Sequence, residues 1–287
     1  MPTQSFAYST IGLMFLSMTL IVGGDAAAKA LTSAEFSPYF VAWTRFALAA
    51  VVLVPFSGMT RAELPLLLNK RVLLRGLLLA LAVCSILTAL KTEPIANVFG
   101  GFFIGPVISY FVSALVLKES ITWPRTALLA LSFIGVLLVV KPGFGMTAGM
   151  GFAVLAGSLH GSFLVVTRSL AQQYRAKFLL ASQLLIGSVI LSPFSLIETP
   201  DIEMNIMGLI VISALGSAFG NLLLLIVNRT TPASVVAPLI YSQLLAAVII
   251  GYLVFADWPD GLSVVGLAII MVSGVWSFWF AAKQAAP

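Results

Sequence analysis

The sequence predicts an all-α integral membrane protein in which ten spanning helices form two inverted five-helix repeats. Three observations support this fold class. Sixty per cent of the 287 residues are hydrophobic and only nine per cent are charged, and the mean hydropathy is +1.10. The chain divides at proline, glycine and charged clusters into apolar runs of about 20 residues, the length that a spanning helix needs. Related stretches of sequence recur in the two halves of the chain at one fixed offset.

The composition excludes several classes of protein. Soluble domains carry about 25% charged residues, and a chain this apolar cannot cover a water-facing surface with polar groups. Lipid is therefore the expected outer solvent. The net charge is +5, but the basic residues are scattered among short loops without a basic stripe, so we expect no nucleic-acid partner. Cys84 is the single cysteine, which excludes an intrachain disulfide and a cysteine-based metal site.

The first apolar run, residues 6–28, is predicted to be a retained span. It is longer than the apolar core of a secretory signal, and no Lys or Arg precedes it. The ten predicted spans are 6–28, 37–57, 71–90, 95–117, 124–140, 148–170, 177–197, 205–228, 233–255 and 260–281.

The distribution of Lys and Arg predicts the orientation. With the N-terminus in the cytoplasm, eleven of the fifteen basic residues fall on cytoplasmic segments and three, Lys29, Lys91 and Lys141, on the other side; Arg45 lies within a span. This bias follows the positive-inside rule. We expect a multi-pass protein of the bacterial inner membrane with both termini in the cytoplasm.

The repeat is clearest in two stretches, KTEPIANVFGG from Lys91 and RTTPASVVAPL from Arg229. The repeat offset, which places Lys91 on Arg229, also aligns further pairs: Pro55 with Pro193, Arg45 with Gln183, and Glu119 with Asp257. Residues 1–143 and 144–287 are therefore predicted to be two copies of one unit. Because each copy has an odd number of spans, the second enters the membrane in the opposite sense, as in many secondary transporters whose substrate site lies between the halves.

No motif indicates catalysis. The sequence contains no Walker A sequence, no HExxH and no Ser/His/Asp constellation. We therefore expect no ATP, no cofactor, no metal and no enzymatic reaction.

A set of residues in the two halves also carries a resemblance to a known family. They are Arg45, Pro94, Pro106, LVLKES at 115–120, Gly135 and Gly143, with the weaker counterparts Gln183, Pro232, Asp257 and Gly274. Over essentially the whole chain, the sequence resembles ten-span members of the drug/metabolite transporter superfamily with two EamA-type repeats. It is most similar to the bacterial aromatic amino-acid exporters of that superfamily. The resemblance implies a central cavity walled mainly by spans three, four, eight and nine. The second copy departs from the pattern at Gln183 and Asp257, so the first copy's roles are not transferred to them.

Aromatic and neutral polar residues are the candidate substrate contacts. Phe99, Phe103, Pro106 and Tyr110 share one face of span four by helical spacing, although a single aromatic residue in a span more often packs in the core or against lipid. His160, the only histidine, is either a hydrogen-bonded packing residue or a substrate contact. The predicted substrate-binding residues are Phe103, Tyr241, His160, Asn97, Asn221, Gln243 and Phe99.

Two prolines within spans, Pro106 and Pro238, are candidate hinges. Each removes an amide donor and frees the carbonyl four residues earlier, so each is either a static kink or a hinge. Arg45 lies near the centre of span two, where an arginine costs about 2.5–3.5 kcal/mol on insertion scales. Its partner is either structural, with Asp25 or helix carbonyls as candidates, or a substrate carboxylate. Asp25 itself is expected near the outer end of span one, where solvation is easy.

Together these features predict a carrier that exports neutral, preferentially aromatic, amino acids by alternating access through an apolar cavity. Its partners are a small-molecule substrate and membrane lipid. One alternative is a broad exporter of drugs or metabolites on the same scaffold. An alternative of another class is a membrane-embedded lipid-handling protein or enzyme.

Overall fold

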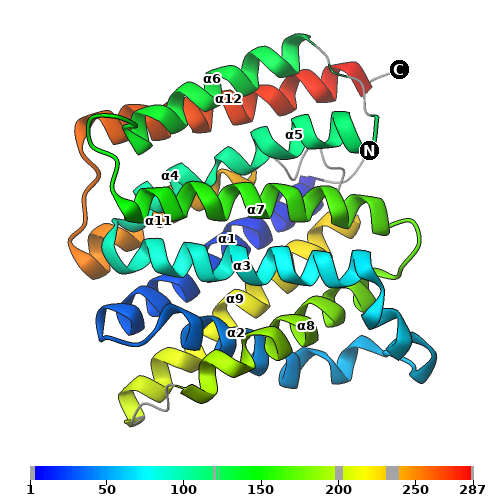
Figure 1. Ribbon diagram of the computed structural model, residues 1–287. Helices are drawn as coiled ribbons and strands as arrows, with labels where there is room; N and C mark the ends of the chain where they lie inside the picture. The colour runs from blue at the N-terminus through cyan, green and yellow to red at the C-terminus, as the bar shows by residue number, and fades with distance from the viewer. Residues whose placement is uncertain (1–3, 119–120, 122, 198–202, 231–238, 286–287) are drawn as a thin grey trace.

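The computed structural model describes residues 4–118, 121, 123–197, 203–230 and 239–285 (Figure 1). Three residues singled out in the sequence, Glu119, Pro232 and the candidate hinge Pro238, lie outside this described part. Within it the secondary structure is helical, with no strand. The α-helices are α1 (Gln4–Ser33), α2 (Pro38–Leu53), α3 (Lys70–Thr92), α4 (Ile95–Phe102), α5 (Ile104–Val116), α6 (Trp123–Val140), α7 (Ala148–Leu170), α8 (Ala176–Ile197), α9 (Met204–Thr230), α11 (Ser242–Phe255) and α12 (Gly261–Ala285). Two 3-10 helices, η1 (Pro55–Ser57) and η2 (Arg61–Leu68), join α2 to α3.

Side-chain caps explain where several helices begin. The side chains of Asn69 and Thr147 accept hydrogen bonds of 2.9 and 3.1 Å from backbone N–H groups in the first turns of α3 and α7. Asp260 does the same for α12 at 3.1 and 3.2 Å. Such caps satisfy N–H groups that have no partner within the helix. Polar residues at the boundaries therefore divide the apolar chain into separate helices.

Six helical segments are long and apolar enough to cross a membrane, judged by length and composition. They are Ile11–Ser33, Lys70–Thr92, Ile95–Val116, Ala148–Leu170, Ala176–Ser195 and Met204–Leu224. Four shorter apolar helices are Pro38–Leu53, Thr126–Val140, Ser242–Phe255 and Gly261–Trp276. The all-helical membrane class is therefore supported, and the count of ten spans stays a prediction.

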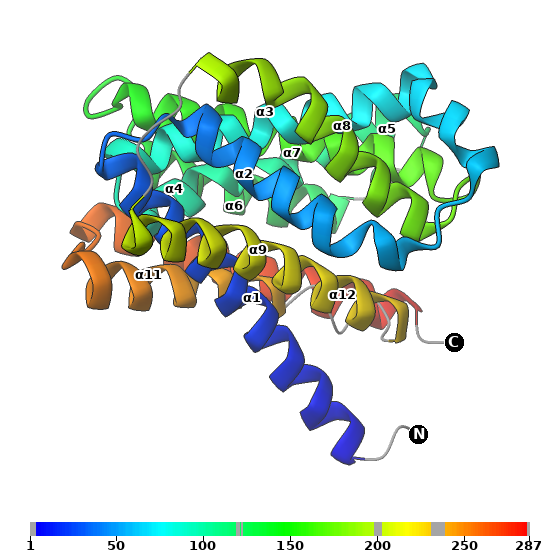
Figure 2. The same cartoon turned by 90° about the horizontal axis from the view of Figure 1, so that it is seen from below.

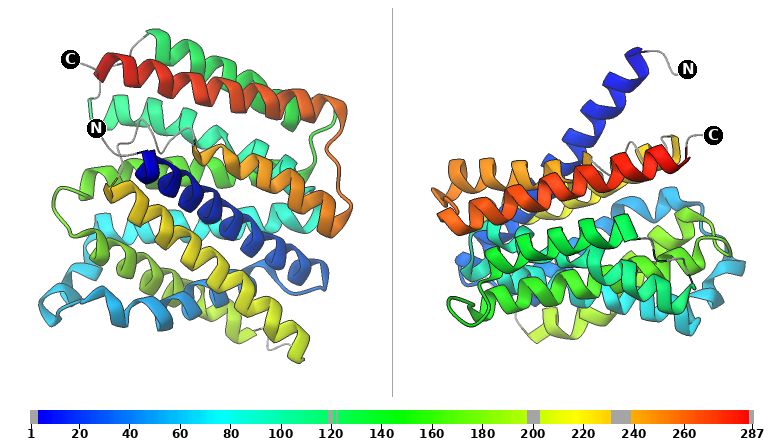
Figure 3. Two further views of the ribbon diagram at one scale, coloured as in Figure 1. Left: turned by 180° about the vertical axis from the view of Figure 1, so that it is seen from behind. Right: turned by 90° about the horizontal axis from the view of Figure 1, so that it is seen from above.

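The helices lie side by side, and their connections gather at two ends of the bundle (Figure 1). The 141–147 and 256–260 connections share one end, and the 171–175 connection lies at the other end with both termini. Helices α1, α9, α11 and α12 lie on one side of the bundle and α3, α7 and α8 on the other (Figure 2). The N-terminal part of α1 projects from the bundle (Figure 3).

The packing of the two halves follows one pattern. Helices α1, α2 and α3 of the first half are equivalent to α7, α8 and α9 of the second. Helices α1 and α2 both pack on α9, and their equivalents α7 and α8 both pack on α3. Helix α1 also contacts α11 as α7 contacts α5. The helix boundaries also correspond under the repeat offset. Helices α2 and α8 begin at equivalent residues, α6 and α12 begin at equivalent residues, and α3 and α9 end at equivalent residues. The two halves therefore share helix boundaries and packing partners, and helices of one half pack mainly on helices of the other.

Glycines allow some of these helices to approach closely. A Cβ atom at Gly161 of α7 would lie 2.4 Å from the carbonyl oxygen of Gly105 in α5. At the α1–α9 contact, the Ser17 hydroxyl donates a 2.7 Å hydrogen bond to the carbonyl of Gly220. Small residues permit such backbone approach between membrane helices.

The predicted fourth span is interrupted where α4 meets α5. The break falls at Phe103, whose φ is −68° and ψ is 3°, and not at Pro106. The physical reason is that the Pro106 ring clashes with the carbonyl of Phe102 and removes its amide partner, so the distortion appears just before the proline. A Cβ atom at Gly157 would lie 2.3 Å from that carbonyl oxygen, which shows that the freed carbonyl faces α7.

Candidate functional site

Phe103 and Tyr241 are in contact where the two halves meet. Their ring centroids are 5.0 Å apart and the rings are tilted by 32°. The side chains are buried, with 4% and 8% of their surface exposed. The repeat offset relates the two positions to each other, and both lie at helix starts in a similar backbone conformation. Equivalent residues of the two copies thus meet ring to ring.

The ring of Tyr241 is held by a neighbouring glycine. A Cβ atom at Gly274 of α12 would lie 2.0 Å from Cζ of Tyr241. The tyrosine ring therefore covers the backbone of α12 at a position that excludes any side chain.

His160 belongs to a second group of rings. This group includes Phe102, the residue that immediately precedes Phe103. The centroid of the His160 ring is 5.1 Å from that of Phe102 and 5.5 Å from that of Phe163. Phe102 in turn contacts Phe99 edge to face, at 6.4 Å. The structure therefore brings two of the predicted residues, Phe99 and His160, together through Phe102, which the sequence did not single out as a substrate contact.

The predicted neutral amides differ in their surroundings. Among the residues that the structure describes, the Oδ1 atom of Asn97 in α4 is buried and has no hydrogen-bond partner. A buried acceptor that lacks a partner costs about 1–3 kcal/mol, so a ligand donor would be favourable there. Gln243 is half-buried in α11. Asn221 is exposed, and its Nδ2 donates to the Ser217 carbonyl of its own helix at 2.8 Å, which leaves it apart from the buried rings.

Arg45 forms a buried ion pair with Asp25. Its NH1 atom lies 2.6 Å from Oδ1 of Asp25. The expectation that Asp25 is easily solvated is wrong, because only 4% of this residue is exposed. Helix α1 continues to Ser33, so Asp25 lies about two turns inside the helix, where its carboxylate meets Arg45 of α2. The charge of Arg45 is thus balanced within the protein.

Arg75 of α3 is a buried polar residue that sequence analysis missed, because it was counted among the basic flanks of a span. Its Nε donates to the Thr167 hydroxyl at 2.8 Å, its NH1 to the Leu179 carbonyl at 2.7 Å and its NH2 to the Gln183 Oε1 at 2.7 Å. Its guanidinium also lies 4.7 Å from the centroid of the Phe163 ring. The available signal was its place in the apolar helix, in the second turn after Lys70.

Ion pairs close one end of the bundle. Lys29 of α1 lies 2.5 Å from Oδ2 of Asp257, which follows α11, and donates to the Glu93 carbonyl at 2.8 Å. The hydroxyl of Thr147 at the start of α7 donates to the Glu93 carboxylate. The Lys29–Asp257 and Thr147–Glu93 contacts join the first half to the second. The other two lysines of this end, Lys91 and Lys141, pair with Glu35 and Asp260.

A further pair links the halves at the opposite end. Arg175, between α7 and α8, contacts both carboxylate oxygens of Glu63 in η2, at 2.7 and 2.8 Å. The hydrogen bonds from Arg175 and from the Thr60 backbone lower the pKa of Glu63 to about 2. The carboxylate in turn raises the pKa of Arg175. Both ends of the bundle therefore carry polar ties between the halves.

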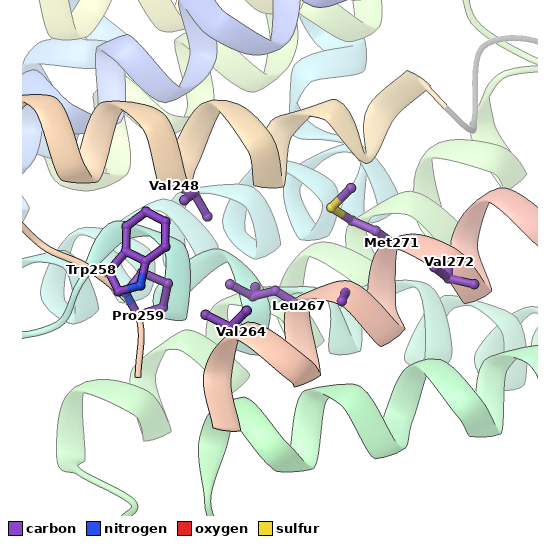
Figure 4. A pocket seen from close by; sticks show the side chains of 8 residues that line it. Val248, Trp258, Pro259, Val264, Leu267, Met271 and Val272 are labelled. Carbon is purple, nitrogen blue, oxygen red and sulfur yellow. The ribbon is translucent and has the colours of Figure 1, made fainter. Parts of the chain in front are cut away.

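An apolar groove of about 260 Å³ lies between α11 and α12 (Figure 4). Its lining residues are Val248, Trp258, Pro259, Val264, Leu267, Ala268, Met271 and Val272. It contains none of the predicted substrate-binding residues. In the described part of the chain, no three His, Cys, Asp or Glu side chains group as a metal site would require.

Comparison with known proteins agrees with this architecture. Over 278 residues the chain is 25% identical to an S-adenosylmethionine uptake transporter of Rickettsia conorii, covering 91% of this chain and 89% of the relative. The protein of the same name from Rickettsia felis is 25% identical over 271 residues, with the same coverage. An uncharacterized transporter of Archaeoglobus fulgidus is 24% identical over 118 residues, which are 40% of this chain and 43% of the relative.

A crystal structure of another protein has the same fold. It superimposes with a TM-score of 0.64 at 15% identity and covers 97% of this chain and 99% of its own.

The family comparison accounts for both repeats. The model of the EamA-like transporter family matches residues 8–141 and again residues 147–279, and the names of the family and of the relatives indicate a transporter and not an enzyme. With two EamA repeats across nearly its whole length, the chain belongs to the EamA-like transporter family, within the drug/metabolite transporter superfamily.

Proposed function

We propose that the chain carries a small amino-acid metabolite bearing a planar ring across the bacterial inner membrane by alternating access. The observation that carries this proposal is the buried contact between Phe103 and Tyr241, which are equivalent in the two repeats. A ring pair at this junction offers aromatic faces to a planar group. The unpartnered Oδ1 of Asn97 offers an acceptor to an ammonium group.

S-adenosylmethionine is the first substrate to test. It joins an adenine ring to an amino-acid group through a sulfonium cation. Rings such as Phe103, Tyr241 and Phe102 suit both parts, because aromatic faces stack on planar bases and attract cations. The Rickettsia relatives are named for uptake of this metabolite, so uptake is the direction to measure first.

Export of aromatic amino acids is the second candidate. The same ring pair favours it, because phenylalanine and tyrosine present a single ring with an amino acid. This candidate differs from S-adenosylmethionine uptake in the direction of transport, and its substrates carry no cationic sulfur. A broad metabolite exporter would instead accept compounds without an amino-acid group, and a lipid-handling protein would move no small solute.

The proposed architecture is ten spans in two inverted repeats, with both termini in the cytoplasm. Predicted spans three, four, eight and nine, which include α3, α4–α5, α9 and α11, would form the main walls. Residues 1–143 and 144–287 would rock against one another. The Lys29–Asp257 and Arg175–Glu63 ion pairs each join one half to the other, and they lie at the two ends of the bundle. Gates on the two sides of a central site would lie in the same way.

Counterflow in proteoliposomes tests the function. Vesicles preloaded with an unlabelled compound are given the same labelled compound outside, with and without a pH gradient, using S-adenosylmethionine and phenylalanine in separate arms. Accumulation of either compound supports the proposal and selects between the two candidates. If neither accumulates while the protein is folded and inserted, the proposed substrate class is wrong. Competition by compounds without an amino-acid group identifies a broad exporter.

A further inference from the structure

Arg75 carries a buried charge that no carboxylate pairs with in the described part of the chain. Only 4% of the residue is exposed, and its described contacts are a hydroxyl, a backbone carbonyl, an amide oxygen and a ring face. All of these are neutral. Neutral acceptors and an aromatic face stabilise a guanidinium, but they leave its net charge in place. A buried cation of this kind is expected to serve an anionic group.

The repeat supplies a comparison for this site. The repeat offset relates Arg45 to Gln183. The first copy places an acid and an arginine against each other on α1 and α2. In the second copy, Gln183 of α8 stands where the first copy has this arginine, and it accepts a hydrogen bond from Arg75 of α3, whose guanidinium also lies over the Phe163 ring of α7.

The two equivalent places therefore differ in charge. The Asp25–Arg45 pair is neutral as a whole, whereas the group of Arg75, Phe163 and Gln183 is positive. The group around Arg75 therefore keeps a net positive charge, which the carboxylate of a ligand would balance.

Geometry also suits such a ligand. A guanidinium has five N–H hydrogens in a planar fork that matches a carboxylate. Three of them are used in the hydrogen bonds described for Arg75, which leaves two. The partners come from α7 and α8 of the second half while Arg75 belongs to the first half, so relative movement of the halves changes access to these two hydrogens.

Arg75 is connected to the candidate substrate site through touching rings. Phe163 lies under the guanidinium and contacts His160, which contacts Phe102. Phe102 immediately precedes Phe103, the partner of Tyr241. An amino acid with a ring could thus present its ring to the aromatic residues and its carboxylate to Arg75.

The geometry points to Arg75 as the residue that binds the carboxylate of the transported metabolite. The inference rests on the proposed function, since it takes the substrate to be an amino acid. It differs from the sequence-based expectation, in which Arg45 was the candidate for a substrate carboxylate.

The test compares substrates that differ only in the carboxylate. Counterflow is measured for labelled S-adenosylmethionine and decarboxylated S-adenosylmethionine, and for labelled phenylalanine and phenethylamine. We expect the wild-type protein to prefer the carboxylated member of the transported pair by at least about tenfold in kcat/KM. Arg75→Gln should abolish this preference by lowering transport of the carboxylated member only. Arg75→Lys, which keeps the charge without the fork, should restore part of it.

Arg71→Gln is the matched control, because Arg71 is an exposed arginine one turn earlier in the same helix. It should keep the wild-type preference. If Arg75→Gln keeps the preference as well, the inference is overturned. If the wild-type protein transports neither pair, the proposed function fails before Arg75 is tested.

A second measurement covers the case in which Arg75→Gln does not fold. Thermal unfolding of the wild-type protein in detergent is followed with each member of the transported pair. Stronger stabilisation by the carboxylated member, together with partial loss of that difference in Arg75→Lys, supports the inference. Equal stabilisation by both members of the pair overturns it.

Discussion

Phe103 and Tyr241 occupy equivalent positions of the two repeats, and their ring centroids are 5.0 Å apart. Residues related by a two-fold repeat can touch only where the repeat axis passes close to both. The contact therefore marks the junction of the halves, and both residues sit at the first turn of a helix, α5 and α11. A change in the relative position of the halves must separate or slide these rings.

Truncation of either ring should impair transport. We expect Phe103→Ala and Tyr241→Ala each to lower counterflow of the transported compound by at least about tenfold, because a buried aromatic pair contributes roughly 0.5–1.5 kcal/mol beyond its buried area and the cavity adds to the loss. Phe219→Ala is the control, since Phe219 is exposed on α9. Normal counterflow by both ring variants would show that the site lies elsewhere.

Gly274 should tolerate no side chain. In Gly274→Ala the new Cβ would lie 2.0 Å from the Tyr241 ring, so the ring must move away from Phe103 at an overpacking cost of about 1–3 kcal/mol. We expect a lower Tm in detergent and reduced transport. Gly208→Ala is the matched control, because nothing lies within 4 Å of a Cβ at that helical position. Equal Tm values for the two variants would contradict the prediction.

The Asp25–Arg45 pair should behave as a unit. Asp25→Asn or Arg45→Gln alone leaves one charge buried without its partner, which costs about 3–5 kcal/mol. The double variant removes both charges and should recover most of that stability. Thermal unfolding of the three variants measures the coupling. Additive losses in the double variant would mean that the two side chains do not stabilise each other.

Acid should weaken the tie between Glu63 and Arg175. The pKa of Glu63 falls from 4.5 to about 2 in the folded protein, chiefly through the hydrogen bond from Arg175. A lowered folded pKa gives stability that is fully present above the unfolded pKa and is lost as the pH falls from about 4.5 through about 2. The wild-type Tm should therefore fall towards that of Glu63→Gln over this range. A constant difference in Tm between the two proteins from pH 6 to pH 2 would contradict it.

Loss of the Lys29–Asp257 pair should open its end of the bundle. The probe is a cysteine placed at the buried Ala96 in a Cys84→Ser background. We expect Asp257→Asn to raise the rate at which a maleimide labels this cysteine by several fold, because one ion pair between the halves is removed. Lys91→Met is the control, since its pair with Glu35 is exposed. A membrane-impermeant reagent applied to intact cells also tests the predicted orientation. Equal labelling with and without Asp257 would exclude a gate at this pair.

Much of the architecture was determined by the sequence alone. Apolar runs bounded by polar caps such as Asn69 and Thr147 predict where helices lie, because a spanning helix and its ends depend on neighbouring residues in the chain. The repeat predicts equivalence of the halves. Phe103 and Tyr241 were chosen as site residues from their place in these helices, and the structure brings them together.

The tertiary structure alone decided which side chains meet. Helical spacing says which residues share a face but not which helix covers it. Asp25 was expected near solvent and is enclosed by neighbouring helices. Asn221 was expected in the site and bonds within its own helix. Arg75 was taken for a flanking charge and lies against α7 and α8 of the other half. Contacts between distant segments depend on the docking of whole helices, and local periodicity carries no information about that docking.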